Sequence, residues 1–165
     1  MFSAEVSKES YLEIAQLYKK TAPALAKAAK SIDTEIVDLK KQFTQQFETH
    51  GYVTSDQVPD SVVSLMQKFC DHAEVELRND GFGRVRDKLL SLYFKTVRFI
   101  RTEDSFGADY ALILQRKAEK HLLKLFCKDP SSQLDKSFGR LASAVCFSAT
   151  MQPAVYFRRM LGFPQ

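Results

Sequence analysis

The chain has 165 residues, of which 45% are hydrophobic and 27% are charged with both signs present, which is typical of a folded domain and excludes a disordered polyelectrolyte. A formal net charge of +4 permits contact with nucleic acid but does not require it, because the basic side chains must also gather on one face. Three widely spaced cysteines indicate reduced thiols, and no apolar run approaches the roughly 20 residues of a membrane span, so we expect a cytoplasmic protein without membrane contact.

The first third of the chain has helical periodicity. Ser10 and Glu13 have the spacing of a capping box, which predicts a helix start at residue 10. Pro23 suits the first turn of a second, short helix that runs towards residue 30. From 31 to about 48 the apolar residues are three or four apart, which predicts an amphipathic helix with the stripe Ile32, Ile36, Leu39, Phe43 and Phe47.

Two further helices are predicted after the break at Gly51. Pro59 opens one that continues to Asn79, and the dense turn signal at 79–83 ends it. The segment from 84 to about 102 is then the longest helix that the pattern predicts.

The periodicity changes in the last third. Short apolar runs at 110–115 and 122–127 flank the polar piece 116–120, which predicts a β-hairpin with a longer loop, although the Ala and Leu content leaves a helix open. A short helix is expected from 131 to 140, and the apolar run 142–147 is the third strand candidate.

One helix carries a basic stripe. At about 100° per residue, four basic residues fall within a narrow sector, opposite an apolar face. Such a stripe can neutralise phosphates along a nucleic-acid backbone, and it can equally be an ordinary solvated face. Phe94 and Phe99 flank it and more often pack against neighbouring helices than stack on bases. The residues predicted to contact the DNA backbone are Arg84, Lys88, Lys95 and Arg98.

No complete catalytic or metal-binding constellation is visible. Cys70 and His72 would lie about 200° apart on a helix, which is wrong for a shared metal. Ser148 and Thr150 follow the predicted last strand, where α/β proteins place ligand-contacting groups, but they can also simply cap the helix expected from Gln152.

The run from Cys146 to Gly162, CFSATMQPAVYFRRMLG, resembles motif III and its sequel in superfamily 2 helicases of the XPD/DinG type. In that family an apolar strand leads into S-A-T-L, a proline, an aromatic pair and L-G. Here Met151 replaces the usual Leu. The N-terminal MFSAEVSKES is similar to the segment after the DEAH box, and the predicted hairpin with Asp129-Pro130 is similar to what precedes motif III.

The resemblance implies that 1–106 is an arch domain, the helical insertion between the DEAH box and motif III, and that 107–165 is part of a motor domain. The expected fold is mainly α, an arch-type helical bundle with a small C-terminal α/β remnant, a β-hairpin plus one strand. The parent protein would be an ATP-dependent 5′-to-3′ DNA helicase of DNA repair that uses ATP and Mg, with an iron–sulfur cluster outside this segment left open.

In this interpretation the partners are single-stranded DNA and the rest of the motor, and motif III residues Ser148 and Thr150 couple ATP hydrolysis to unwinding. The chain alone is not expected to be catalytic and holds no cofactor, because the nucleotide-binding motif, the DEAH acids and the second motor domain would lie beyond it. The alternative is a helical protein–protein interaction module without nucleic-acid binding. A stand-alone enzyme conflicts with the absent constellations.

Overall fold

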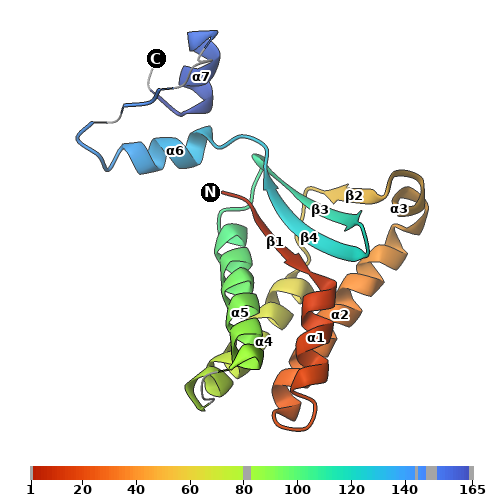
Figure 1. Ribbon diagram of the computed structural model, residues 1–165. Coiled ribbons are helices and arrows are strands. Elements are labelled where there is room, and N and C mark those ends of the chain that lie inside the picture. The colour runs from red at the N-terminus through yellow and green to blue at the C-terminus, as the bar shows by residue number, and fades with distance from the viewer. Residues whose placement is uncertain (1, 80–82, 144, 148–151, 164–165) are drawn as a thin grey trace.

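The computed structural model describes residues 2–79, 83–143, 145–147 and 152–163, and it is mainly helical with one small antiparallel sheet (Figure 1). The predicted mainly α fold class is therefore confirmed. In chain order, its elements are β1 (Ala4–Ser7), α1 (Lys8–Leu17), α2 (Pro23–Gln42), α3 (Thr44–His50), β2 (Tyr52–Ser55), α4 (Asp60–Asn79), α5 (Arg84–Glu103), β3 (Tyr110–Lys117), β4 (Lys120–Cys127), α6 (Ser131–Phe138) and α7 (Ala154–Met160).

The four strands form one antiparallel sheet in the order β1-β4-β3-β2. Alternate residues of a strand point to the same face. The sheet therefore has one apolar face, and strands from both sides of the predicted boundary at residue 106 build it. One row of paired, buried residues crosses it from edge to edge: Val6, Leu123, Leu114 and Val53.

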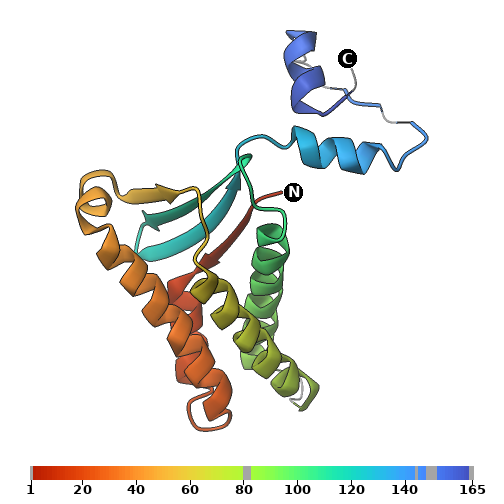
Figure 2. The same ribbon diagram turned by 180° about the vertical axis from the view of Figure 1, so that it is seen from behind.

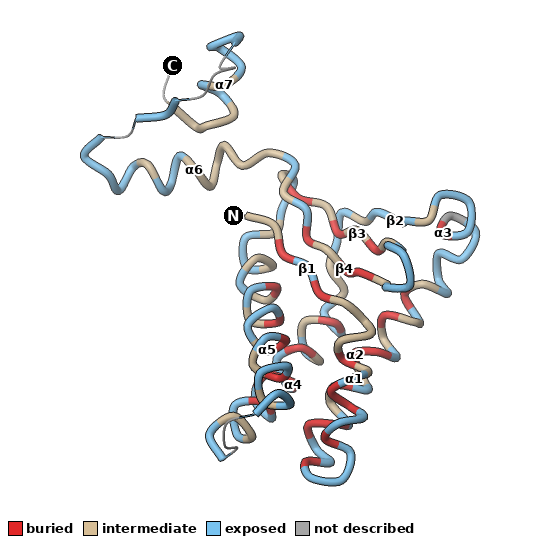
Figure 3. The backbone as a smooth tube through the Cα atoms, in the orientation of Figure 1, coloured by how far each residue is buried: buried red, intermediate tan, exposed pale blue. Residues whose placement is uncertain are grey.

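Helices α1, α2, α4 and α5 pack together on this face of the sheet, as the front and back views show (Figures 1 and 2). Buried positions gather where these helices and strands face one another (Figure 3). Each fully buried aliphatic or aromatic side chain contributes about 1.5–3 kcal/mol to stability. The core between helices and sheet is thus the main source of stability for residues 4–125.

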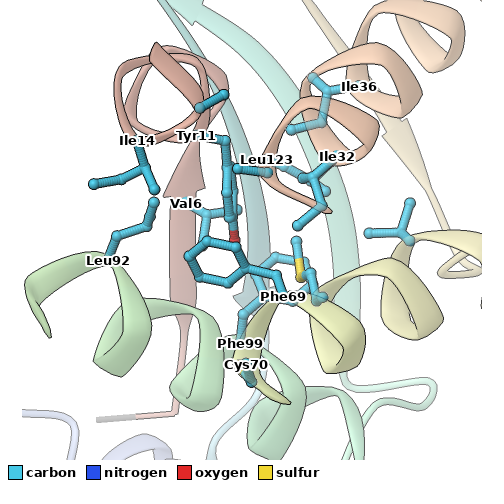
Figure 4. Close-up of a cluster of buried hydrophobic side chains, with 14 of the residues drawn as sticks. Val6, Tyr11, Ile14, Ile32, Ile36, Phe69, Cys70, Leu92, Phe99 and Leu123 are labelled. Atoms are coloured by element: carbon cyan, nitrogen blue, oxygen red, sulfur yellow. The ribbon is translucent and has the colours of Figure 1, made fainter. Parts of the chain in front are cut away.

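Tyr11 of α1 lies at the centre of this core (Figure 4). Its ring meets the edge of Phe69 with centroids 5.3 Å apart, and its hydroxyl lies 2.7 Å from Oγ1 of Thr96. Thr96 donates its own hydrogen to the carbonyl of Leu92 at 2.9 Å. The Tyr11 hydroxyl is therefore the donor of the pair, and burial raises its pKa, which keeps that donor in place.

Only the first part of the predicted amphipathic stripe forms the inner face of α2, since Phe43 is the exposed C-cap of this helix and Phe47 is buried on α3. Ile32, Ile36 and Leu39 are all buried, and Pro23 occupies the first turn as predicted. The prediction of a helix boundary near residue 31 is wrong, since α2 runs without interruption from Pro23 to Gln42. The physical reason is that Ser31 and Thr34 do not break the helix but donate back to carbonyls four residues earlier within it.

The start of α1 differs from the capping-box prediction. The helix begins at Lys8, so Ser10 is already inside its first turn and Ser7 occupies the N-cap. The Ser7 hydroxyl donates to the Glu9 carboxylate at 2.9 Å. Glu9 also accepts from the backbone N–H of His121 in β4, at 3.0 Å to its nearer oxygen, so the strand and not a capping box sets where α1 begins.

Two strands lie in segments for which no strand was predicted. β1 and β2 have four residues each, which is too short for alternation to be read from the sequence. Gly51, at a φ of +73°, ends α3 in the left-handed region and lets the chain turn into β2.

The predicted β-hairpin is confirmed as β3 and β4, which pair from Tyr110 with Cys127 to Lys117 with Lys120. Its loop is shorter than predicted, because the polar residues join the strands and leave only Ala118 and Glu119 in the turn.

The predicted strand at 142–147 is wrong for its described residues. Ala142, Ser143 and 145–147 belong to no strand and are exposed. An apolar run becomes a strand only beside a hydrogen-bonding neighbour, and the described part of the chain offers none here.

The C-terminal helices α6 and α7 stand apart from the core (Figures 1 and 2). The residues that follow α7 contact α6, with the rings of Phe138 and Phe163 stacked at 5.0 Å. Gly162, at a φ of +69°, lies so close to α6 that a Cβ would come within 2.3 Å of the Ser131 carbonyl oxygen. The described residues of this segment include no buried position.

Candidate nucleic-acid interface

The four predicted contact residues, Arg84, Lys88, Lys95 and Arg98, are all exposed side chains of α5. The opposite face of the helix is buried, with Leu89, Leu92 and Thr96 in the core. From first to last the four span about 21 Å of helix axis. Their surroundings differ along that length.

Lys88 is paired with an acid of another helix. Its Nζ lies 2.5 Å from Oε1 of Glu13 in α1, and both side chains are about half exposed. The two lie in a groove of about 290 Å³ between α1 and α5, where Asp87 and Lys95 also contribute. Two lysines and two carboxylates nearly cancel, so the middle of the stripe has little net positive charge.

Arg98 is engaged with the start of the chain. Its Nη2 donates to the backbone carbonyl of Ser3 at 2.6 Å. The contact ties the C-terminal half of α5 to the residue before β1, which gives Arg98 a structural role beside any role in binding.

A second groove, of about 440 Å³, follows the C-terminal half of α5, and we call it the α5 groove. Its lining includes Phe94, Arg98 and Arg101, and the described residues that line it include no aspartate or glutamate. Phe2, Tyr110 and Gln133 bring in the start of the chain, β3 and α6.

Phe94 is 60% exposed, although the sequence favoured packing for both Phe94 and Phe99. Phe99 is fully buried as predicted. Arg101 was not among the predicted contact residues, because it lies outside the narrow sector of the stripe. An arginine seven residues after an aromatic on one helix was the signal that could have found it.

Ser148 and Thr150, predicted to couple ATP hydrolysis to unwinding, lie outside the described residues. Their described neighbour Phe147 is 91% exposed, as part of an apolar segment that includes Val145 at 86% and Val155 at 80%.

Neither Cys70 nor Cys127 has the environment of a nucleophile. Burial, reinforced by the nearby carboxylates of Asp71 and Glu74, raises the pKa of Cys70 to about 12. Burial also raises the pKa of Cys127, which donates to the carbonyl of Asp129 at 3.3 Å. Both thiols are therefore protonated at neutral pH.

The described residues contain neither a metal site nor a membrane-spanning helix. Within these residues, no group of three or more histidine, cysteine, aspartate or glutamate side chains lies close enough to hold a metal ion. None of the helices in this part of the chain combines the length and the apolar character needed to cross a membrane.

The candidate binding features of the described residues are thus the α5 groove, the basic stripe of α5 and the exposed apolar residues Val145, Phe147 and Val155. Comparison of the chain with models of protein families and with curated protein sequences gives no match.

Proposed function

We propose that this chain is the arch region of an XPD/DinG-like, ATP-dependent 5′-to-3′ DNA helicase, and that it guides single-stranded DNA. The sequence support is the motif III resemblance of the run from 146 to 162. The structural support is that residues 3–127 form a helical module whose first and last residues lie side by side.

The closeness of the two ends of this module is the observation that carries the proposal. The backbone N–H of Cys127 donates to the Ser3 hydroxyl at 3.0 Å, so the chain leaves β4 beside the place where it enters β1 (Figure 1). A domain inserted into another domain needs this arrangement, because its two connections must meet the same host surface.

The segment after the module supports a host on that side. The exposed side chains of Val145, Phe147 and Val155 would be covered by the rest of a motor domain, which is the partner proposed for them. The close approach of Gly162 to α6 gives a physical reason for a glycine in the L-G end of the motif. The coupling role of Ser148 and Thr150 remains part of the proposal.

The test is the binding of single-stranded DNA by the purified chain as a function of salt. We expect weak binding of a fluorescein-labelled oligothymidine that falls steeply with salt concentration, as measured by fluorescence anisotropy. Arg84→Gln with Lys88→Gln should lower the slope of log K against log salt by at most about two. Glu13 already balances Lys88, so the loss should come mainly from Arg84.

The matched control is Lys117→Gln with Lys120→Gln, which removes the same charge from exposed positions at the hairpin turn. It should leave binding nearly unchanged. Absence of strand binding at low salt would contradict the proposed function. The exposed apolar segment would then favour the alternative, a protein–protein interaction module without nucleic-acid binding.

A further inference from the structure

The α5 groove combines an exposed aromatic ring with positive charge. Phe94 and Arg101 project from the same helix, seven residues or about two turns apart, into one cavity of about 440 Å³. An aromatic face and an arginine in one groove suit the two parts of a nucleotide, a flat base and a phosphate.

The Phe94 ring is supported from behind. Tyr93 packs against it edge to face, with centroids 5.5 Å apart. Tyr93 is itself held in place, because its hydroxyl donates to Oε1 of Glu74 in α4 at 2.7 Å. That hydrogen bond is the main reason why the pKa of Tyr93 is raised to about 12, so the donor persists at neutral pH. Phe94 is therefore braced by a fixed neighbour although 60% of its surface is exposed.

The wall next to Phe94 is also fixed. Arg98 donates to the Ser3 carbonyl at 2.6 Å, which holds its guanidinium at the edge of the groove. The groove lies where the start of the chain, β3 and α6 meet α5. A DNA strand bound there would pass beside Ser3, where the two ends of the module meet.

Charge distinguishes this groove from the one between α1 and α5. The latter is lined by two lysines and two carboxylates, whereas the α5 groove has two arginines and no carboxylate among its described lining residues. The charge of the α5 groove therefore favours an anionic ligand, whereas the nearly neutral groove between α1 and α5 neither attracts nor repels one.

We propose that the α5 groove is a stacking subsite for one base of a single DNA strand, with Phe94 as the platform and Arg101 as the phosphate contact. This inference rests on the proposed function, because it presumes that the chain binds single-stranded DNA. It moves the main contact away from the stripe and names the part of the ligand that is recognised, the π-face of a base, which any sequence offers.

The experiment compares variants of the full chain against a fluorescein-labelled oligothymidine of about 12 nucleotides, within the length that one binding groove covers. Phe94→Ala should weaken binding about 10-fold at fixed salt and leave the salt slope unchanged. Phe94→Trp, which keeps a ring, should stay within about twofold of the unchanged chain. Arg101→Gln should reduce the magnitude of the slope of log K against log salt by about one.

The matched control is Tyr52→Ala, which removes an aromatic side chain of similar exposure, 51%, from the sheet edge at β2. It should not change the affinity. A fully abasic strand of the same length supplies the complementary test, because no shift of register can bring a base onto Phe94. It should bind the unchanged chain more weakly than the oligothymidine, and Phe94→Ala should then cause no further loss.

The outcomes separate the two proposals. If the chain binds the strand but Phe94→Ala binds as tightly as the unchanged chain, the subsite is wrong and the proposed function stands. If the chain binds no strand at low salt, the proposed function fails first. Far-ultraviolet circular dichroism of each variant confirms that it is folded, as expected for exposed positions.

Discussion

The hydroxyl of Tyr11 shows what a single buried polar atom requires in this core. Its side chain is 0% exposed, and Thr96 is the acceptor that compensates for the loss of water. Because Thr96 donates its own hydrogen bond to the carbonyl of Leu92, Tyr11, Thr96 and Leu92 form a chain of hydrogen bonds that all run in one direction. A buried donor without an acceptor costs more than the net value of the bond itself.

We therefore predict that the two ends of this bond respond unequally to mutation. Tyr11→Phe removes the donor and should lower the free energy of unfolding by about 1 kcal/mol. Thr96→Val keeps the shape but leaves the Tyr11 hydroxyl buried without an acceptor, which should cost about 2 kcal/mol. The double variant should lose less than the sum of the two. Urea denaturation measures all three, and additive losses would contradict the directed bond.

At the scale of the elements, Asp33 links helix α2 to the start of helix α1. It is a 3%-exposed residue of α2 that pairs with Lys8 at the start of α1, at 3.2 Å, and with Lys30 of its own helix. Burial alone would raise the pKa of Asp33, but the hydrogen bonds and charges of Lys30 and Lys8 outweigh it and lower that pKa. The charged form is thus the one that the folded state prefers.

The sign of the pH dependence follows from this shift. A carboxyl with a lowered pKa in the folded state contributes stability above its unfolded pKa, near 3.9, and that contribution is lost as the pH falls through the lower folded value. Asp33→Asn should lower the free energy of unfolding by about 2 kcal/mol at pH 7 and flatten its decline in acid. Urea midpoints between neutral and acidic pH measure both effects.

Asp38→Asn is the matched control on the same helix. Its carboxylate pairs with Lys41 at 2.9 Å, but its side chain is 51% exposed, so water replaces the lost partner. The change should be less than about 0.5 kcal/mol. Equal losses at Asp33 and Asp38 would show that the α1–α2 junction does not depend on the buried pair.

At the scale of the whole molecule, the core and the C-terminal helices are separate. Among the described residues no position after Leu125 is buried, and β4 is already paired on both sides by β1 and β3. The core therefore closes before α6 begins, and α6 and α7 contribute little to it.

We predict that a chain shortened to residues 1–128 folds cooperatively with nearly the stability of the full chain. The free energy of unfolding should change by less than about 1 kcal/mol, because none of the described side chains that are removed is buried. The shortened chain should also associate less, since it lacks the exposed Val145 and Phe147. Urea denaturation and light scattering check the two expectations, and failure of the shortened chain to fold would contradict the separation.

The sequence by itself determined α4, α5 and the apolar stripe of α2, and it favoured the hairpin of β3 and β4. The stripe of α2, the proline before α4 and the apolar face of α5 are local patterns that repeat over several turns, so few alternatives compete with them. It also identified which face of α5 carries Arg84, Lys88, Lys95 and Arg98, since 3.6 residues per turn decides that without reference to neighbours.

Only the tertiary structure decided what lies next to those patterns. β1 and β2 are strands because β4 and β3 offer them hydrogen-bond partners, and the run at 142–147 is none in its described residues because it has no such partner. Glu13 and Ser3 reach Lys88 and Arg98 from 75 and 95 residues away. Such long-range contacts leave no periodic trace in a sequence.

The same reason explains the two phenylalanines of α5. Phe94 and Phe99 are five residues apart on one helix, and nothing local distinguishes them. Phe99 is buried because the core lies against its side of α5, whereas Phe94 lines an open groove. Which aromatic stabilises the fold and which is left for a ligand is decided by the elements around the helix, because burial depends on the whole packing and not on spacing alone.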